Sequence, residues 1–504
     1  MAQRLLPDGA PMTEQRGRTA GSGVPGLDEI LEGGFPRGRL FLIQGDPGVG
    51  KTTLALQYLL EGRLAGEAGL YITLAETRDE LEAVAASHGW DLDGISVFEQ
   101  RVDPVLGLDE ENTLFHPSEV ELAETTRALI AEVERVKPDR VVIDSLSELR
   151  LLAQSGLRYR RQILALKQYF AGQRATVLLL DDRTTAVGDQ QLQSVAHGVL
   201  SMDQLAPLYG GDRRRLRAVK MRGVAIKGGY HDFRITHGGI RVYPRLVAAD
   251  HPTTFAPGAL ASGSPELDLL LGGGLAHGTS TLFLGPPGSG KSVLGMQYAV
   301  AAAKRGDNAI VFAFDETRHV SLTRAAGLGL DLDGHPGEVV VQQIDPAEMA
   351  PGEFVSLARA AVEERNAQVV VVDSLNGYMH AMPQEQFLVL QLHELLTYLA
   401  QRGVITILVV AQHGVMGGTM TTPVDISYLA DTVLLFRHFE SGGRLRKALS
   451  ILKKRTGGHE TTIRELMIGP AGIRVGPALV DFHGVLSGIP QYTGVGKGLL
   501  PDGE

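Results

Sequence analysis

A glycine-rich segment ending in Gly-Lys-Thr or Gly-Lys-Ser occurs twice in this 504-residue chain. The two segments are Gly45, Asp46, Pro47, Gly48, Val49, Gly50, Lys51 and Thr52, and then Gly285, Pro286, Pro287, Gly288, Ser289, Gly290, Lys291 and Ser292. In such a loop the glycines let backbone N–H groups turn inward around phosphate oxygens, and the lysine supplies charge for the β- and γ-phosphates. The chain is therefore expected to bind a nucleoside triphosphate at two sites, which also include Thr53 and Val293.

Each loop needs ligands for the magnesium ion that accompanies the phosphates. The hydroxyl groups of Thr52 and Ser292 take the usual metal-binding position of the loop. Asp144 and Asp373 each end an aliphatic run that reads as a buried strand, and a carboxylate there can reach Mg²⁺ or its water shell. The alternative is that each aspartate caps the helix that follows. We expect the four residues to form two metal sites.

Hydrolysis also requires a group that orients or deprotonates the attacking water. Acidic residues end the next strand in both halves: Glu76 in the first, and Asp315 with Glu316 in the second. The carboxyl ends of strands beside a phosphate loop are where ligands bind in open α/β sheets. These three carboxylates are the candidate catalytic residues. The alternative is that they cap the helices that follow.

The segments around the two loops are related to each other. Residues 24–58 align without a gap on residues 264–298, and the two loop lysines are 240 positions apart (291 − 51 = 240). This period far exceeds the 20 to 50 residues of stacked repeats, so it indicates a duplicated domain.

The elements that must position these residues follow the same order in each half. Short, wholly aliphatic strands alternate with amphipathic helices, which predicts a mostly parallel central sheet flanked by helices. Residues 216–243 and 431–475 then alternate in polarity, which indicates antiparallel hairpins at the C-terminal end of each half. After about Pro477 we expect no regular structure.

Domain boundaries follow from composition, because Pro, Ala, Thr, Ser and Gly gather between the halves. The predicted parts are a flexible arm at 1–18, a first domain at 19–247, a linker at 248–262, a second domain at 263–490 and a flexible tail at 491–504.

Composition excludes several classes of function. Zero cysteines exclude disulfides, thiolate metal sites and thiol catalysis. The net charge of −10, from 48 basic and 58 acidic residues, argues against broad nucleic-acid binding. The longest aliphatic stretch, Val404 to Ala411, is far shorter than the ~18 residues of a membrane span. A soluble cytoplasmic protein without a membrane partner is expected.

Together, the doubled loop, the Gly-Leu-Asp-x-x-Leu-x-Gly-Gly lead-in that starts at Gly26, the acidic strand ends and the two Asp-Ser pairs resemble the KaiC family. That family comprises double-domain, RecA-like ATPases best known from the cyanobacterial circadian clock, and the resemblance covers about residues 18–490. It implies two tandem RecA-like P-loop domains, ATP and Mg²⁺ as ligands, and a homohexamer with ATP between neighbouring subunits. It also implies a signalling or clock-like role, with KaiB-like or other signalling proteins as partners.

The resemblance further implies that one subunit contributes cations to the nucleotide of the next. The family pattern is Lys-x-Arg on a late strand, matched by Lys220 and Arg222 in the first half and by Lys453 and Arg455 in the second. His459 extends the match in the second half. Without the resemblance, these residues read as a solvated strand face.

Two positions depart from the family pattern. Ala75 stands where the family has the first of two consecutive carboxylates, so slower turnover is expected in the first half. Ser427 falls on a serine that clock KaiC phosphorylates, but Tyr428 replaces the adjacent threonine. Either Ser427 alone accepts phosphate, as a serine autokinase of the second domain requires, or the protein is a plain ATPase.

Two rival functions stay open. A nucleic-acid-binding recombinase or helicase could use the same RecA-like core, with residues 213–217 and 453–455 as its basic clusters. An ATP-dependent scaffold with little turnover is the other. GTP is disfavoured as the nucleotide because the chain has no Asn-Lys-x-Asp specificity motif.

Overall fold

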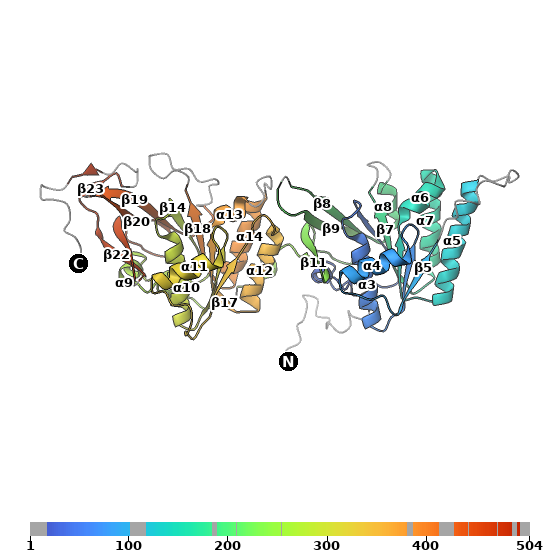
Figure 1. Ribbon diagram of the computed structural model, residues 1–504, viewed down its shortest axis with the longest axis horizontal. Helices are drawn as coiled ribbons and strands as arrows, with labels where there is room; N and C mark the ends of the chain where they lie inside the picture. Colours follow the sequence, from blue (N-terminus) through green and yellow to red (C-terminus); the bar gives the residue numbers. More distant parts are fainter. Residues whose placement is uncertain are drawn as a thin grey trace. The chain divides into compact units, whose positions relative to one another are not determined.

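The computed structural model describes residues 18–100, 117–183, 189–207, 209–253, 255–380, 387–412, 428–441, 443–470, 472–485 and 491–493. The chain divides into two compact units at the junction of Arg245 and Leu246 (Figure 1).

The first unit is built on one mixed sheet. In the described part of this unit nine strands pair in the order β11-β10-β9-β8-β3-β7-β6-β4-β5. The strands are β3 (Leu40–Gly45), β4 (Gly69–Thr73), β5 (Ile95–Glu99), β6 (Arg140–Asp144), β7 (Thr176–Asp182), β8 (Gly198–Leu205), β9 (Arg213–Met221), β10 (His231–Thr236) and β11 (Gly239–Tyr243). The six strands from β8 to β5 are parallel, whereas β8, β9, β10 and β11 run antiparallel to one another.

Helices connect and cover these strands. They are α2 (Leu27–Ile30), α3 (Lys51–Leu64), α4 (Arg78–Ser87), α5 (Pro117–Val136), α6 (Leu146–Ala153), α7 (Gly156–Ala171) and α8 (Asp189–Val195). A short antiparallel pair, β1 (Thr19–Ala20) with β2 (Phe35–Pro36), precedes the sheet.

The second unit repeats the plan. Its described residues form a nine-stranded sheet in the order β16-β15-β17-β18-β14-β19-β20-β21-β22. The strands are β14 (Ser280–Gly285), β15 (Asn308–Ala313), β16 (Val339–Gln343), β17 (Ala367–Asp373), β18 (Ile405–Ala411), β19 (Thr432–Ser441), β20 (Arg444–Lys454), β21 (Arg464–Gly469) and β22 (Gly472–Ala478). The helices are η1 (Ala248–Asp250), α9 (Pro265–Leu270), α10 (Lys291–Lys304), α11 (Arg318–Gly327), α12 (Pro351–Glu363), α13 (Leu375–His380) and α14 (Leu388–Gln401), and β12 (Ala259–Leu260) pairs with β13 (Leu275–Ala276).

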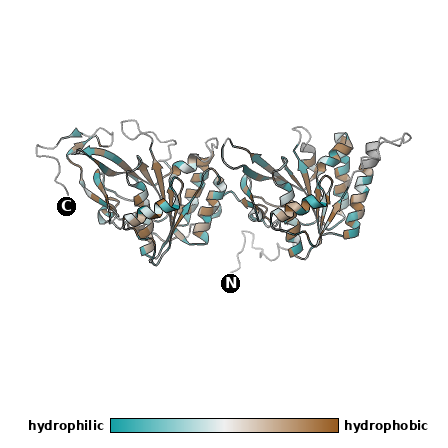
Figure 2. Cartoon of the chain, viewed as in Figure 1, coloured by the Kyte–Doolittle hydropathy of each residue, from teal (hydrophilic) through white to brown (hydrophobic). Residues whose placement is uncertain are grey.

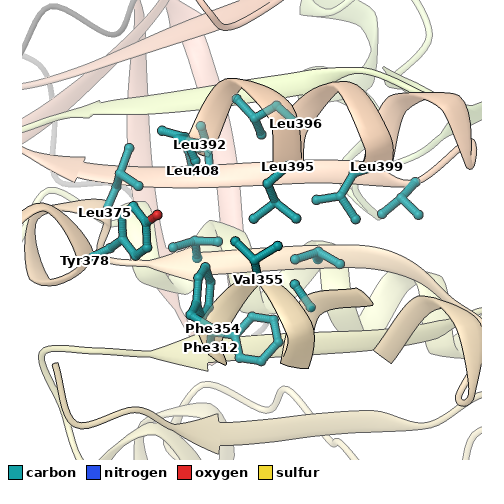
Figure 3. Packing of buried hydrophobic residues seen from close by; sticks show 14 of the residues in the cluster. Phe312, Phe354, Val355, Leu375, Tyr378, Leu392, Leu395, Leu396, Leu399 and Leu408 are labelled. Atoms are coloured by element: carbon teal, nitrogen blue, oxygen red, sulfur yellow. The ribbon is translucent and has the colours of Figure 1, made fainter. Parts of the chain in front are cut away.

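The cores lie on both faces of the sheets, because all six residues of β3 and all six of β14 are buried. Hydrophobic residues accordingly concentrate along the central strands of each unit (Figure 2). On α14, leucines recur at helical spacing and form one apolar face. Leu395 and Leu399 of this face belong to the same hydrophobic cluster as Phe354 and Val355 of α12 (Figure 3).

The expected fold is confirmed: each half is a mostly parallel sheet that ends in antiparallel strands. The expectation of no regular structure after about Pro477 is wrong. β23 (Phe482–His483) pairs with β24 (Gln491–Tyr492), and the Phe482 ring contacts the rings of Phe439 and Tyr492. These aromatic contacts stabilise a short hairpin in a segment whose composition favours loops.

At the junction between the units, the structure adds a detail that composition does not reveal. Leu246 and Ala248 lie in the hydrophobic core of the second unit, and the Ala248 backbone N–H donates to Glu394 on α14. The five predicted domain boundaries stay predictions. Among the described residues, no helix is both long and apolar enough to cross a membrane.

Candidate nucleotide-binding sites

Both glycine-rich loops join the end of a central strand to the start of a long helix: β3 to α3, and β14 to α10. Gly50 and Gly290 take the N-cap positions with φ of 109° and 105°, a conformation that favours glycine. The free N–H groups of each first helical turn therefore face the loop. A helix N-terminus joined to such a loop suits a bound phosphate.

Lys51 extends back along its own loop. Its Nζ donates to the carbonyl oxygens of Gly45 (3.0 Å) and Asp46 (2.9 Å), and the side chain is only 7% exposed. The same Nζ lies 2.6 Å from a carboxylate oxygen of Asp182, at the end of β7. Thus the lysine of the first loop has an anionic partner within the chain.

Lys291 has the same backbone contacts but different electrostatics. Its Nζ donates to the carbonyls of Gly285 (2.9 Å) and Pro286 (2.7 Å). Within the part of the chain that the structure describes, no acidic side chain forms an ion pair with it. Burial lowers the pKa of Lys291 to about 8, although the charge of Asp373 opposes the shift. A buried cation without an ion-pair partner fits an anionic ligand such as a phosphate group.

The predicted metal ligands come together in both halves. Thr52 donates its hydroxyl to Asp144 at 3.1 Å, across the carboxyl edge of the sheet. Burial raises the pKa of Asp144, and hydrogen bonds from Tyr71 and Thr52 oppose the shift. In the second half, burial raises the pKa of Asp373 to about 6, and a hydrogen bond from Ser292 opposes the shift.

Each site thus has a buried carboxylate next to the loop hydroxyl. Oxygen ligands of this kind suit Mg²⁺, which commonly uses one or two protein ligands together with water and phosphate oxygens. The donor sets therefore fit the metal that the sequence predicts.

Glu76 lies in an unusual environment in the first half. Thr73 fixes its backbone, since the Thr73 hydroxyl donates to the Glu76 carbonyl (2.6 Å) and accepts from its N–H (2.9 Å). Burial raises the pKa of Glu76, and the negative charge of Asp144 adds to the shift. The carboxylate oxygen Oε2 is buried and has no hydrogen-bond partner among the residues that the structure describes. A poorly solvated carboxylate without a donor is poised to accept a proton.

Ala75 and Glu76 line an open pocket of about 560 Å³, together with Leu74, Thr77, Glu99, Gln100 and Glu148. The missing carboxylate at position 75 therefore leaves space beside Glu76.

The second half arranges its acidic pair differently. The Ser374 hydroxyl donates to Asp315, while Glu316 forms a two-pronged ion pair with Arg324 and accepts from the Ser321 hydroxyl. Both oxygens of Glu316 are therefore engaged. The matching positions of the first half, 240 residues earlier, hold Leu81 and Val84, which cannot form these bonds.

The Lys-x-Arg residues do not approach the loops of their own units. The backbone N–H of Arg222 donates to the carbonyl of His197. The backbone N–H of His197 in turn donates to the carbonyl of Leu40, the first residue of β3. The phosphate loop follows Gly45 at the other end of that strand, about 17 Å away along five residues. Lys220 and Arg222 instead donate to backbone carbonyls, of Gln193 and Ser194.

Arg455 occupies the matching place in the second unit. Its backbone N–H donates to the backbone carbonyl of Asp431. The Asp431 N–H in turn donates to the carbonyl of Ser280, the first residue of β14. The Arg455 side chain contacts the Asp431 carboxylate (3.3 Å) and the Tyr428 carbonyl (3.0 Å). Lys453 donates to Ala430, and His459 follows in a loop beyond β20. The proposed acceptor Ser427 lies outside the described residues.

Sequence reasoning missed several residues of these sites. It did not identify Asp182 beside Lys51, the Tyr71 hydroxyl on Asp144, or the contacts of Ser374 and Arg324 with the acidic pair. One signal was available, because the aliphatic run of β7 ends in Asp181-Asp182 as β6 ends in Asp144.

Comparison with known proteins adds independent evidence. The model of a family described as "ATPase: KaiC" matches residues 20–247 and 260–480. The "Circadian clock protein KaiC3" of Synechocystis sp. (strain ATCC 27184 / PCC 6803 / Kazusa) is 27% identical over 487 residues, which cover 94% of each chain. The "Circadian clock oscillator protein KaiC" of Synechococcus elongatus (strain ATCC 33912 / PCC 7942 / FACHB-805) is 25% identical over 484 residues, which cover 93% of this chain and 91% of that protein.

Proposed function

Because the chain belongs to the KaiC family of ATPases, we propose that both halves bind ATP with Mg²⁺ and that the second half carries most of the hydrolysis. The observation that carries this proposal is the duplicated arrangement of a buried loop lysine and a hydroxyl–carboxylate pair at the carboxyl edge of each sheet. Lys51 and Lys291 would bind the phosphates. Thr52 with Asp144, and Ser292 with Asp373, would hold the metal, which neutralises charge on the transferred phosphoryl group.

In the second half we assign the water-activating role to Asp315. The Ser374 hydroxyl orients its carboxylate, whereas Arg324 and Ser321 occupy both oxygens of Glu316. Asp315 can thus accept the proton of an attacking water, and Glu316 fixes the start of α11. In the first half Glu76 is the available carboxylate, because Ala75 has no acidic side chain.

The assembly that we propose is a homohexamer with ATP between subunits. The supporting observation is the position of Lys220, Arg222, Lys453 and Arg455 at the strand ends opposite their own phosphate loops. Such cations can serve the phosphates of a neighbouring subunit, where they would stabilise the charge that develops during transfer. Hydrolysis would then depend on assembly.

A serine autokinase in the second domain and a signalling or clock-like role belong to this proposal, with KaiB-like or other signalling proteins as partners. They rest on the match of Ser427 and on the names of the relatives. Phosphopeptide mapping after incubation with ATP tests the kinase. Phosphate on Ser427 that disappears in Lys291→Ala supports it, and a lack of phosphate after prolonged incubation leaves a plain ATPase.

The recombinase or helicase alternative receives less support. In β9, Arg214 pairs with Asp212, while Arg215 and Arg217 stack on the ring of Tyr230. These cations already have partners within the chain.

Native mass measurement tests the central proposal. With ATP and Mg²⁺ the wild-type protein should reach six times the mass of its 54.0 kDa chain. A mass that is independent of nucleotide would contradict ATP-dependent assembly. ATP-dependent retention of single-stranded DNA would instead favour the nucleic-acid alternative.

A further inference from the structure

The end of β7 brings two consecutive carboxylates to the edge of the first phosphate loop, because β7 pairs with β3 and Asp182 is level with Gly45. Asp181 is fully buried and forms an ion pair with Arg150 at 2.6 Å. Asp182 forms its ion pair with Lys51, also at 2.6 Å. The two acidic residues therefore have different cations, and the cation of Asp182 is the lysine of the loop.

The second half lacks this carboxylate. Ala411 occupies the matching register position, level with Gly285. Asn376 binds both backbone groups of Ala411, accepting from its N–H (2.8 Å) and donating to its carbonyl (3.1 Å). The duplicated sites thus differ by one charge next to the loop lysine.

We propose that Asp182 is an internal counter-ion of Lys51 that competes with the phosphates of the nucleotide, so that the first site binds ATP more weakly than the second. This inference rests on the proposed function, in which both loops bind ATP. Asp182 is thereby a residue that determines the affinity of one site and leaves the other unaffected.

The contacts explain why this carboxylate opposes binding. Lys51 is buried and already donates to two loop carbonyls, so each further anion competes for the same ammonium group. A carboxylate held beside that group also repels an incoming triphosphate. Asp182 is 28% exposed, so water screens part of the interaction. Its removal should therefore change ATP affinity by roughly tenfold, the change expected for a partly screened ion pair.

The test measures ATP affinity at one site at a time. The Lys291→Ala protein leaves the first loop intact. In this background, equilibrium binding of labelled ATP is measured for the protein that keeps Asp182 and for the Asp182→Asn and Asp182→Ala variants. Asn keeps the shape without the charge, and Ala reproduces the residue of the second half. Both variants should bind ATP roughly tenfold more tightly. Unchanged or weaker binding in both would overturn the inference.

The reciprocal change uses the second site. In Lys51→Ala protein, Ala411→Asp should weaken ATP binding by a similar factor, while Ala411→Asn controls for the added volume. Equal affinities of the Asp and Asn variants would also overturn the inference, provided that thermal unfolding shows both to be folded. Failure of the proposed function is distinguishable, because wild-type protein would then bind no ATP at either site.

Discussion

At the scale of single residues, the two halves use similar side chains in different electrostatic environments. Glu76 has a buried oxygen that finds no hydrogen-bond partner within the described ranges, whereas its counterpart Glu316 is paired with Arg324. Lys51 forms an ion pair with Asp182, whereas Lys291 forms no ion pair in the described part of the chain, although the charge of Asp373 acts on it. Duplicated sites with such differences are expected to differ in both binding and turnover.

The assignment of Asp315 leads to the first prediction. Asp315→Asn should lower steady-state ATP hydrolysis by a factor on the order of 10² to 10⁴ at the second site, because the loss of a positioned base has an effect of this size. Glu316→Gln should have a smaller effect, since Arg324 and Ser321 already engage that carboxylate. Phosphate release from single variants measures both. If Glu76→Gln removed most of the activity instead, the first half would be the main catalyst.

The second prediction concerns the pH dependence of stability. Burial raises the pKa of Asp373 from 3.8 to about 6 in the folded protein. The stability associated with its protonated form is therefore full below pH 3.8 and is lost as the pH rises through about 6. Without nucleotide or Mg²⁺, Asp373→Asn should stabilise the protein by on the order of 3 kcal/mol at pH 7.5 and by less at pH 5.

Urea unfolding at the two pH values measures this effect. Asp333→Asn, at an exposed position, is the control and should change stability little at either pH. A gain for Asp373→Asn that grew as the pH fell would contradict the assigned direction of the pKa shift.

At the scale of elements, a helix N-cap directly follows the acidic residue at the end of a strand in both halves. Thr77 and Thr317, which directly follow Glu76 and Glu316, are the N-cap residues of α4 and α11. Thr77 forms a full capping box with Glu80, whereas Thr317 accepts only from the backbone N–H of Val320. The same hydroxyl position thus supports the candidate catalytic carboxylates of both halves.

This cap gives the third prediction. Thr77→Ala should destabilise the first unit by about 1 kcal/mol, because it leaves the Glu80 N–H without its side-chain acceptor. Denaturant unfolding measures the loss, and Thr77→Ser, which keeps the hydroxyl, should retain most of the stability. Equal stability of the Ala and Ser variants would show that the capping bond contributes nothing measurable.

At the scale of the whole molecule, the two units repeat one sheet order, and the cations of each lie away from its own loop. In the described part of each unit, these cations lie at the strand ends opposite that unit's own phosphate loop. This arrangement favours an oligomer in which nucleotide joins one subunit to the next.

The last prediction follows from that arrangement. Lys51→Ala combined with Lys291→Ala should abolish ATP binding and weaken the proposed hexamer, since the phosphates would no longer link the subunits. Arg222→Ala combined with Arg455→Ala should weaken assembly while each loop keeps its lysine. Native mass measurement with and without ATP compares the variants. A double lysine variant that stayed hexameric regardless of nucleotide would contradict the prediction.

The sequence by itself indicated the duplication, both phosphate loops and the alternation of central strands with helices, because these depend on contiguous motifs and on local periodicity. It also indicated Asp144 and Asp373 as candidate metal ligands, since each ends an aliphatic strand. The sequence could not determine which charged side chains lie next to each other in the folded protein. Lys51 and Asp182 are 131 positions apart (182 − 51 = 131) and become neighbours only because β7 lies beside β3. The distance between the Lys-x-Arg residues and their own loops likewise depends on strand register, which hydrogen bonding across the folded sheet decides.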